Sequence, residues 1–160
     1  MGFLEALEAT AFADWVLISM LGFPTLIALH SIGMGVAVGL SLIVALRLNR
    51  VITSLDARLL PRLLTLAVSG FVLNLITGLA LFVSRGTEYI ASGIFLLKML
   101  FVVISAAIMF WLRRRLIVAA QMADAQVVDG RAIQMSVVFT VTWLCAVITG
   151  RLIAYLSDLY

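Results

Sequence analysis

The chain has 160 residues, of which 64% are hydrophobic and 12% are charged, and its formal net charge is +3. This composition excludes a soluble globular domain and a disordered chain, and the length has room for about four membrane spans with short connections. The single cysteine excludes an internal disulfide and a cysteine-based zinc or iron–sulfur site. We therefore predict one membrane domain over residues 1–160, with the lipid bilayer as its surroundings and no nucleic-acid partner.

The N-terminal residues 2–20 place apolar side chains at helical spacing against three acidic ones, Glu5, Glu8 and Asp14. This pattern is typical of an amphipathic helix that lies in the membrane interface, with Trp15 as an anchor among lipid head groups. The acidic residues are unlike the basic start of a cleavable signal peptide, so we expect the first span to remain in the mature protein.

The stretch from Trp15 to Leu46 is uncharged and exceeds the roughly 20 residues that cross a bilayer core as a helix. Pro24 suits the first turn of a helix, and we predict the first span over residues 23–46. The only histidine, His30, then lies about 9 Å into the core. A polar, ligand-capable side chain in hydrocarbon is costly unless it has a partner, so His30 predicts a functional site.

Three further apolar stretches predict spans over residues 63–84, 89–112 and 132–157. The second span carries Gly70, Asn74 and Gly78 at i, i+4 and i+8, a face where a neighbouring backbone can approach closely. The first span has a similar stripe of small residues that is also spaced for helix packing, namely Ser31, Gly35 and Gly39.

The third span contains Lys98 and ends at a basic run that begins with Arg113. Residues 116–131 are more polar, and we predict a short surface helix there that is closed by Gly130.

Arginines concentrate in two of the three connections. Four lie between the first two spans and four between the last two, whereas the middle connection has only Arg85. The positive-inside rule then puts the two arginine-rich connections in the cytoplasm and both termini outside. The predicted fold is an all-α, integral membrane, antiparallel four-helix bundle that follows an N-terminal interfacial amphipathic helix.

On this topology, His30, Thr77, Lys98 and Arg151 reach a similar depth in the outer leaflet from four different spans. One interpretation is a b-type haem with His30 as the axial metal ligand and Lys98 and Arg151 as partners of the propionates. In this interpretation Gly78 lets the flat macrocycle approach the second span.

One histidine leaves the other axial position of such a haem to Met34, to Met20 or another thioether, to a histidine of another subunit, or to no ligand. A quinone pocket formed by His30, Arg151 and Trp15 uses much of the same cluster. Copper is a further alternative, because imidazole and thioether groups suit Cu(I).

Each of these residues also has a purely structural interpretation. His30 can be a core histidine that is hydrogen-bonded to a hydroxyl or carbonyl group, and Lys98 and Arg151 can extend to the membrane interface. The sequence contains no hydrolase triad, carboxylate pair or phosphate-binding loop, so we predict no catalytic residues and no independent enzymatic activity.

Three segments carry a resemblance to a known family: LIALHSIGMGVAVG (26–39), TGLALFVSRGTEYIASGIFLLKML (77–100) and ITGRLIAYL (148–156). They resemble a family of uncharacterised four-span bacterial membrane proteins, known only as a domain of unknown function. The resemblance implies a bacterial inner-membrane location and a pattern of one polar position in each span. In this chain the pattern corresponds to His30, Thr77 and Gly78, Lys98, and Gly150 and Arg151.

The chain is also distantly similar to the membrane domain of copper-resistance D-type proteins and to small b-type membrane cytochromes. It departs from the cytochromes in lacking their second histidine. Two functional hypotheses follow. The first is a small electron-transfer subunit that holds haem or quinone in the outer leaflet. The second is a non-catalytic subunit that packs against a larger membrane complex or against copies of itself.

Overall fold

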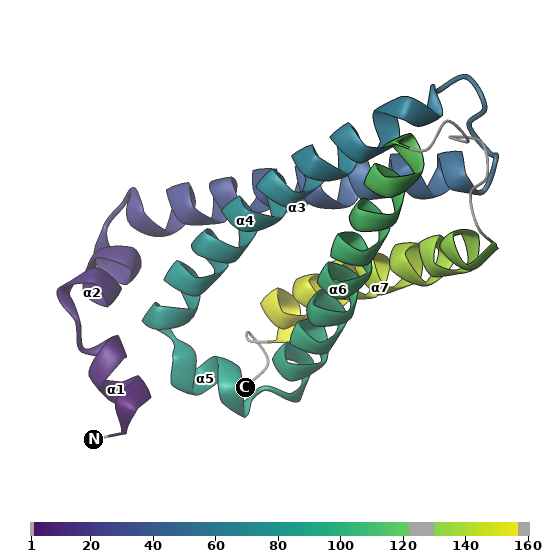
Figure 1. The fold of residues 1–160 in the computed structure, drawn as a ribbon. Coiled ribbons are helices and arrows are strands. Elements are labelled where there is room, and N and C mark those ends of the chain that lie inside the picture. Colours follow the sequence, from purple (N-terminus) through teal and green to yellow (C-terminus); the bar gives the residue numbers. More distant parts are fainter. Residues whose placement is uncertain (1, 122–129, 157–160) are drawn as a thin grey trace.

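The computed structural model describes residues 2–121 and 130–156, and these contain seven α-helices, one short 3-10 helix and no β-strand. Four of the helices are long and apolar enough to cross a membrane. They form the antiparallel bundle seen in Figure 1, which confirms the predicted all-α fold class. Their bounds are α3 Gly22–Leu48, α4 Leu60–Ser84, α6 Gly93–Gln121 and α7 Gly130–Leu156.

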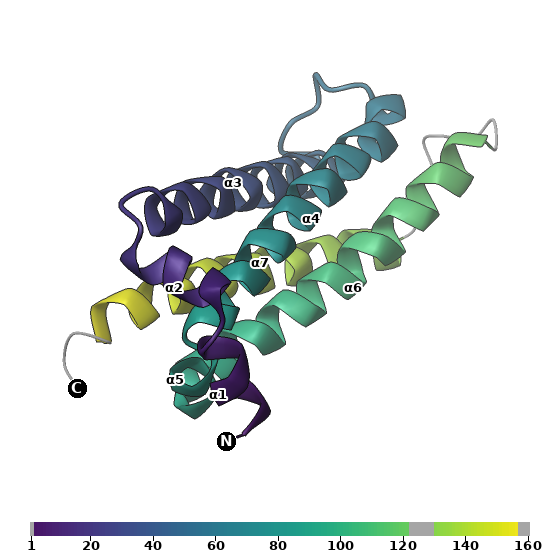
Figure 2. The same ribbon diagram turned by 90° about the vertical axis from the view of Figure 1, so that its left-hand side faces the viewer.

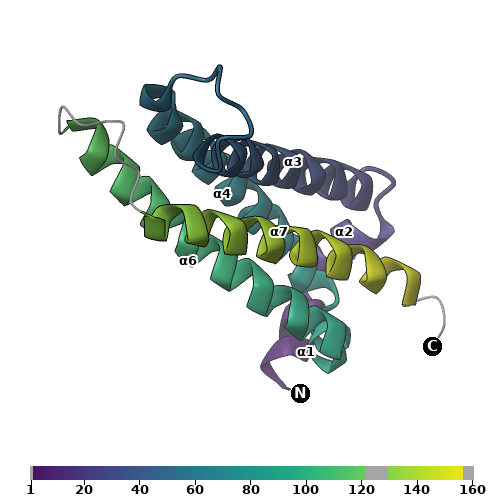
Figure 3. The same cartoon turned by 90° about the vertical axis from the view of Figure 1, so that its right-hand side faces the viewer.

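The bundle consists of two helical hairpins, α3 with α4 and α6 with α7, which meet through α3 against α7 and α4 against α6. Figure 3 shows α3 beside α4 on one side of the molecule and α7 beside α6 on the other. The buried side chains of α6 begin only at Ser105, and they continue through Met109 and Leu112. The hydrophobic core therefore lies toward the end of the bundle that carries the α3–α4 and α6–α7 connections.

We name the two ends of the bundle by their residues. The arginine-rich end carries the α3–α4 and α6–α7 connections, with Arg47, Arg50, Arg58, Arg62, Arg113, Arg114, Arg115 and Arg131. The histidine end is the opposite one, where α3 begins. His30 lies there, in the third turn of α3. The short helices α1 (Phe3–Glu8), α2 (Ala11–Ile18) and α5 (Gly86–Ala91) gather at the histidine end, as Figure 2 shows.

The N-terminal segment forms two short helices rather than the single helix predicted over residues 2–20. Thr10 separates them, because its hydroxyl accepts a hydrogen bond from the backbone N–H of Ala13 (3.3 Å) and so caps the start of α2. Ala13 and Val16 are completely buried, because α2 packs against α3 and α4. The segment is therefore part of the packed structure at the histidine end.

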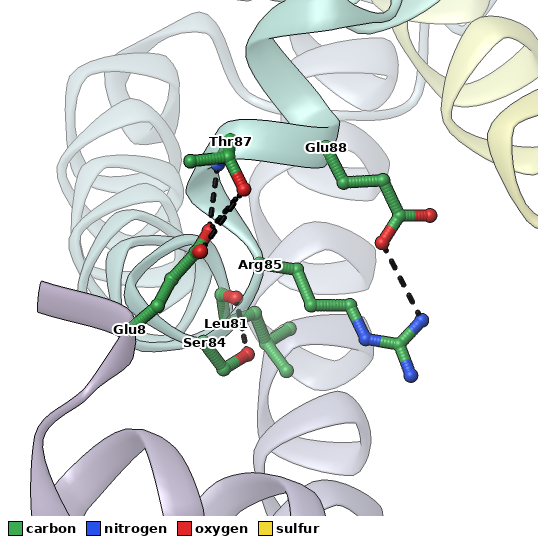
Figure 4. Close-up of polar contacts among 6 residues, drawn as sticks. All are labelled: Glu8, Leu81, Ser84, Arg85, Thr87 and Glu88. Carbon is green, nitrogen blue, oxygen red and sulfur yellow. Dashed lines mark hydrogen bonds and ion pairs between the residues drawn. The ribbon is translucent and has the colours of Figure 1, made fainter. Parts of the chain in front are cut away.

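A hydrogen-bonded contact ties α1 to α5 at the histidine end (Figure 4). The Glu8 carboxylate accepts hydrogen bonds from the backbone N–H of Thr87 (2.7 Å) and from its hydroxyl (2.7 and 2.9 Å). These bonds favour the ionised carboxylate and lower the pKa of Glu8. Arg85 and Glu88 form an exposed ion pair nearby, with 3.7 Å between charged atoms.

The ends of the third span differ from the prediction. Residues 86–91 form the separate helix α5, so α6 begins at Gly93 rather than at residue 89. At its other end α6 continues through the arginines to Gln121, because arginine, leucine and alanine are good helix formers and long cationic side chains reach water.

The short surface helix predicted over residues 116–131 is therefore wrong for its first residues, which belong to α6. Gly130 begins α7 instead of closing a helix. Residues 122–129, and the last residue predicted for the fourth span, lie outside the described residues.

Candidate functional site

The candidate site is the contact between α3 and α4 at the histidine end. His30 and Asn74 exchange hydrogen bonds across it. The ring nitrogen Nδ1 of His30 lies 3.0 Å from the backbone oxygen of Asn74, and the side-chain Nδ2 of Asn74 donates to the backbone oxygen of His30 at 2.8 Å. Each residue thus provides a hydrogen-bond partner for a side-chain nitrogen of the other across the helix contact.

The neighbours of Nδ1 determine which tautomer of His30 is present. The Thr77 hydroxyl lies 3.2 Å from Nδ1, but its proton is donated to the backbone oxygen of Leu73 at 2.7 Å. Both oxygens near Nδ1 therefore offer it only lone pairs. We assign the proton to Nδ1, which leaves Nε2 of the neutral ring with a free lone pair. Such a nitrogen can bind a metal or accept a hydrogen bond.

Two glycines bring the backbones of α3 and α4 close together below His30. A Cβ atom placed on Gly33 would lie 2.7 Å from the backbone nitrogen of Asn74, and one on Gly70 would lie 2.8 Å from the Cβ atom of Val36. These contacts confirm the packing face predicted for Gly70 and Asn74 on the second span. They also position Asn74 for its bonds with His30.

The stripe of small residues predicted on the first span does not pack against another described helix of this chain. Ser31, Gly35 and Gly39 are exposed, and nothing lies within 4 Å of a Cβ atom placed on either glycine. The helix is instead rotated so that Gly33 and Ala37 face α4, where both are buried.

Gly78 lies beside the ring of His30. A Cβ atom placed on Gly78 would lie 3.0 Å from Cε1 and 3.4 Å from Nδ1 of the ring. Glycine therefore makes room here for the imidazole itself, and its predicted role of admitting a macrocycle stays a prediction. Any larger side chain at this position would push the ring away from Asn74 and Thr77.

Lys98 reaches the same region from the other hairpin. Its side chain is half-buried and lies along Gly150 of α7, where an added Cβ atom would be 3.4 Å from Cε and 3.6 Å from Nζ. Within residues 2–121 and 130–156, no carboxylate forms an ion pair with Lys98 and no hydrogen bond satisfies it.

The other residues predicted for the site lie apart from this cluster or at its edge. Met34 is half-buried one turn after His30 on α3. Arg151 is exposed near the end of α7, Met20 is 93% exposed before α3, and Trp15 is 46% exposed on α2. The structure therefore brings His30, Thr77 and Gly78 together at the α3–α4 contact. It places Lys98 beside Gly150 on the other hairpin.

Sequence reasoning assigned Asn74 only to a packing face, whereas both its backbone oxygen and its side chain bond His30. The signal was an amide three residues before Thr77 in an otherwise apolar span, where a polar side chain needs a partner. The described residues contain no group of three or more His, Cys, Asp or Glu side chains that could hold a metal ion.

Comparison of the chain with protein-family models, curated proteins and solved structures finds no match. The resemblance described above therefore stays a prediction, and the functional argument depends on the site itself.

Proposed function

We propose that the protein is a small integral membrane subunit that binds a b-type haem through Nε2 of His30 and serves electron transfer. The observation that most supports this proposal is the hydrogen bond from Nδ1 of His30 to the backbone oxygen of Asn74. Histidines that bind metals almost always donate their other ring N–H to a carbonyl or carboxylate, which fixes the ring and makes the free nitrogen a better ligand. His30 has this arrangement, with Nδ1 against the backbone oxygen of Asn74.

The charge of Lys98 is a second observation that favours an anionic ligand at the histidine end. An ammonium group in a membrane span is costly without a counter-charge, and the described part of the chain supplies no carboxylate for Lys98. A haem propionate would provide that charge, with Arg151 as the partner of the second propionate at the exposed end of α7. When bound, the haem iron would supply one-electron chemistry.

The chain's own residues have distinct roles in this proposal. Asn74 and Thr77 hold the imidazole in one orientation. His30 would bind the iron, and Lys98 would hold a propionate. A second iron ligand would be Met34, Met20 or another thioether after a rearrangement, or a histidine of another subunit, and a haem without a second ligand is the remaining case. We place the histidine end on the external side of a bacterial inner membrane, because the arginines concentrate at the opposite end.

A visible spectrum of the purified protein tests the proposal, after expression with an ample haem supply. The parent chain should show a Soret band, and His30→Ala should lose it while keeping its helical circular dichroism. Gly35→Ala is the matched control on the same helix, since nothing lies near that position. Lys98→Gln should weaken haem binding by about 1–3 kcal/mol, the range for a hydrogen bond to a charged group.

A His30→Ala protein that keeps the parent spectrum would refute ligation by His30. A parent without a Soret band, whose organic extract contains quinone that His30→Ala fails to retain, would replace haem with quinone at this site. Copper in elemental analysis of the parent, absent from His30→Ala, would replace it with copper.

The second candidate is the non-catalytic packing subunit. It is favoured by the reciprocal bonds between His30 and Asn74, which are sufficient to join α3 to α4 without any ligand. Under this alternative, no cofactor accompanies the purified chain, and His30→Ala lowers only the stability of the bundle.

A further inference from the structure

The arginine-rich end holds a second cluster, where α4 and α6 meet. The Nε–H of Arg113 on α6 donates a hydrogen bond to the hydroxyl oxygen of Thr65 on α4 at 3.1 Å. That hydroxyl donates its own proton to the backbone oxygen of Pro61 at 2.8 Å, so it can act only as an acceptor toward Arg113. The guanidinium of Arg113 is thereby fixed across the contact between the two hairpins.

Arg62 is a second cation, on α4, near Thr65 in the sequence. It lies three residues before Thr65 in α4, and residues at this spacing are neighbours on one helix face. Arg62 is exposed and Arg113 is half-buried. Thr65 is thus hydrogen-bonded to an arginine of α6 and lies one turn after an arginine of α4, so each hairpin contributes one arginine to this region.

The described carboxylates do not neutralise this pair. Asp56 is the one described acidic residue at this end, and its carboxylate accepts a hydrogen bond from the backbone N–H of Arg58 at 2.9 Å. The ion pair among the described side chains, Arg85 with Glu88, lies at the histidine end. Two nearby guanidinium groups of this kind match the oxygens of a phosphate group, which accepts bidentate hydrogen bonds from arginine.

The position of the pair along the bundle indicates which phosphate it meets. The apolar part of α6 ends directly before Arg113, and the guanidinium of Arg115 lies 5.4 Å from the ring centre of half-buried Trp111. Tryptophan and arginine at the end of an apolar helix mark the level of the lipid head groups. Exposed Leu66 and Phe110 beside the pair offer apolar surface for acyl chains.

We propose that Arg62 and Arg113 form a binding site for the phosphate of an anionic phospholipid, which joins the two hairpins at the arginine-rich end. The proposal is independent of any cofactor at His30. A lipid held there would neutralise two cations from different hairpins and stabilise the α4–α6 contact. Salt would weaken the binding, because the site is near water and partly screened.

The test uses the full chain in vesicles of phosphatidylcholine with and without phosphatidylglycerol. Thermal unfolding and the phosphatidylglycerol retained after detergent purification are both measured. We expect phosphatidylglycerol to raise the melting temperature of the parent chain. Arg62→Gln and Arg113→Gln should each lower its affinity about tenfold, as expected for one lost charge-assisted hydrogen bond.

Arg85→Gln is the control, because it removes the same charge from the histidine end. Among the described residues, the side chain of Arg62 has no hydrogen-bond partner, so Arg62→Gln tests the site even if Arg113→Gln destabilises the chain. Three outcomes would overturn the proposal: unchanged lipid retention in both site variants, an equal loss in Arg85→Gln, or equal stabilisation by inorganic phosphate, which would make the ligand a free anion.

Discussion

The two helices of the first hairpin, α3 and α4, contact each other in a different way from the two helices of the second, α6 and α7. Between α3 and α4 the backbones themselves touch at Gly33 and Gly70, and polar groups are exchanged between His30 and Asn74. Between α6 and α7 the contact is made by side chains, including a buried hydrogen bond of 2.8 Å from the Ser105 hydroxyl to that of Thr142. Side chains can change rotamer to absorb a new atom, whereas two touching backbones must separate.

This difference explains where the chain can position a ligand-binding group. A backbone oxygen in a closely packed helix pair is a rigid acceptor, so the His30 ring bonded to it has one orientation. Lys98, which lies on the other hairpin, has a long flexible stem that can follow a ligand. In the proposed function, the first hairpin thus fixes the orientation of the His30 ring, and the second supplies a positive charge on the flexible side chain of Lys98.

The largest effect should come from a methyl group added to the first hairpin. Gly33→Ala would place Cβ 2.7 Å from the nitrogen of Asn74 and 2.8 Å from the oxygen of Gly70, both backbone atoms. We expect a loss of about 1–3 kcal/mol in unfolding free energy, as for other overpacked cores. Unfolding in mixed detergent, followed by circular dichroism, measures it.

Gly150→Ala is the matched substitution on the second hairpin, where Cβ would meet only the flexible Lys98 side chain at 3.4 Å. Its cost should be clearly smaller than that of Gly33→Ala. Equal costs would show that the two hairpins do not differ in the way described.

A moderate effect is expected from Asn74→Ala. The change removes the bond from Nδ2 to the backbone oxygen of His30 but keeps the backbone oxygen that accepts from Nδ1. The loss should be about 1 kcal/mol, within the range for hydrogen bonds between membrane helices. Ser69→Ala is the control on α4, because its hydroxyl bonds only its own helix. A loss no larger than that of Ser69→Ala would contradict a stabilising role for this bond.

A smaller effect is expected from Thr142→Val on the second hairpin, about 0.6 kcal/mol, the average for such bonds in a membrane protein. Adding Ser105→Ala should cost little more, because the shared bond is already lost. Thr140→Val, whose hydroxyl bonds the backbone of its own helix, provides the baseline in the same unfolding assay. Fully additive losses from Ser105→Ala and Thr142→Val would argue against the shared bond.

The smallest effect concerns the contact between α1 and α5. Because the pKa of Glu8 is lowered in the folded chain, its contribution to stability is present above the ordinary carboxyl pKa and is lost as pH falls through the lowered value. Glu8→Gln should therefore lower the melting temperature at neutral pH, and the difference from the parent should vanish in acid. A difference that does not change with pH would mean that the charge of Glu8 is irrelevant.

The four long helices could be predicted because each apolar run is long enough to cross a bilayer, and α3 extends only slightly beyond the predicted 23–46 at either end. The break at Thr10 could also have been foreseen from its hydroxyl, which is a good cap. The end of α6 could not have been predicted in this way. A basic run marks the edge of the membrane, whereas the backbone hydrogen bonds of the helix can continue beyond it.

The candidate site was predicted by residue type but not by orientation. Helix α3 carries two stripes of small residues on opposite faces, one with Gly35 and one with Gly33, and both have the spacing of a helix contact. The choice between the two stripes depends on which one fits the surface of α4. The residue pattern of α3 alone does not contain that information. The same rotation decides that His30 meets Asn74, and so it also decides the tautomer of the ring.

Helix α6 has one further consequence for motion. Its 29 residues span about 43 Å, more than the thickness of the hydrocarbon core, and after Gly93 they include neither glycine nor proline. The helix therefore has none of the glycine or proline positions that commonly cause a sharp kink. If it tilted about its middle as one body, Lys98 and Arg113 would move in opposite directions, and the two proposed sites would then be coupled through α6.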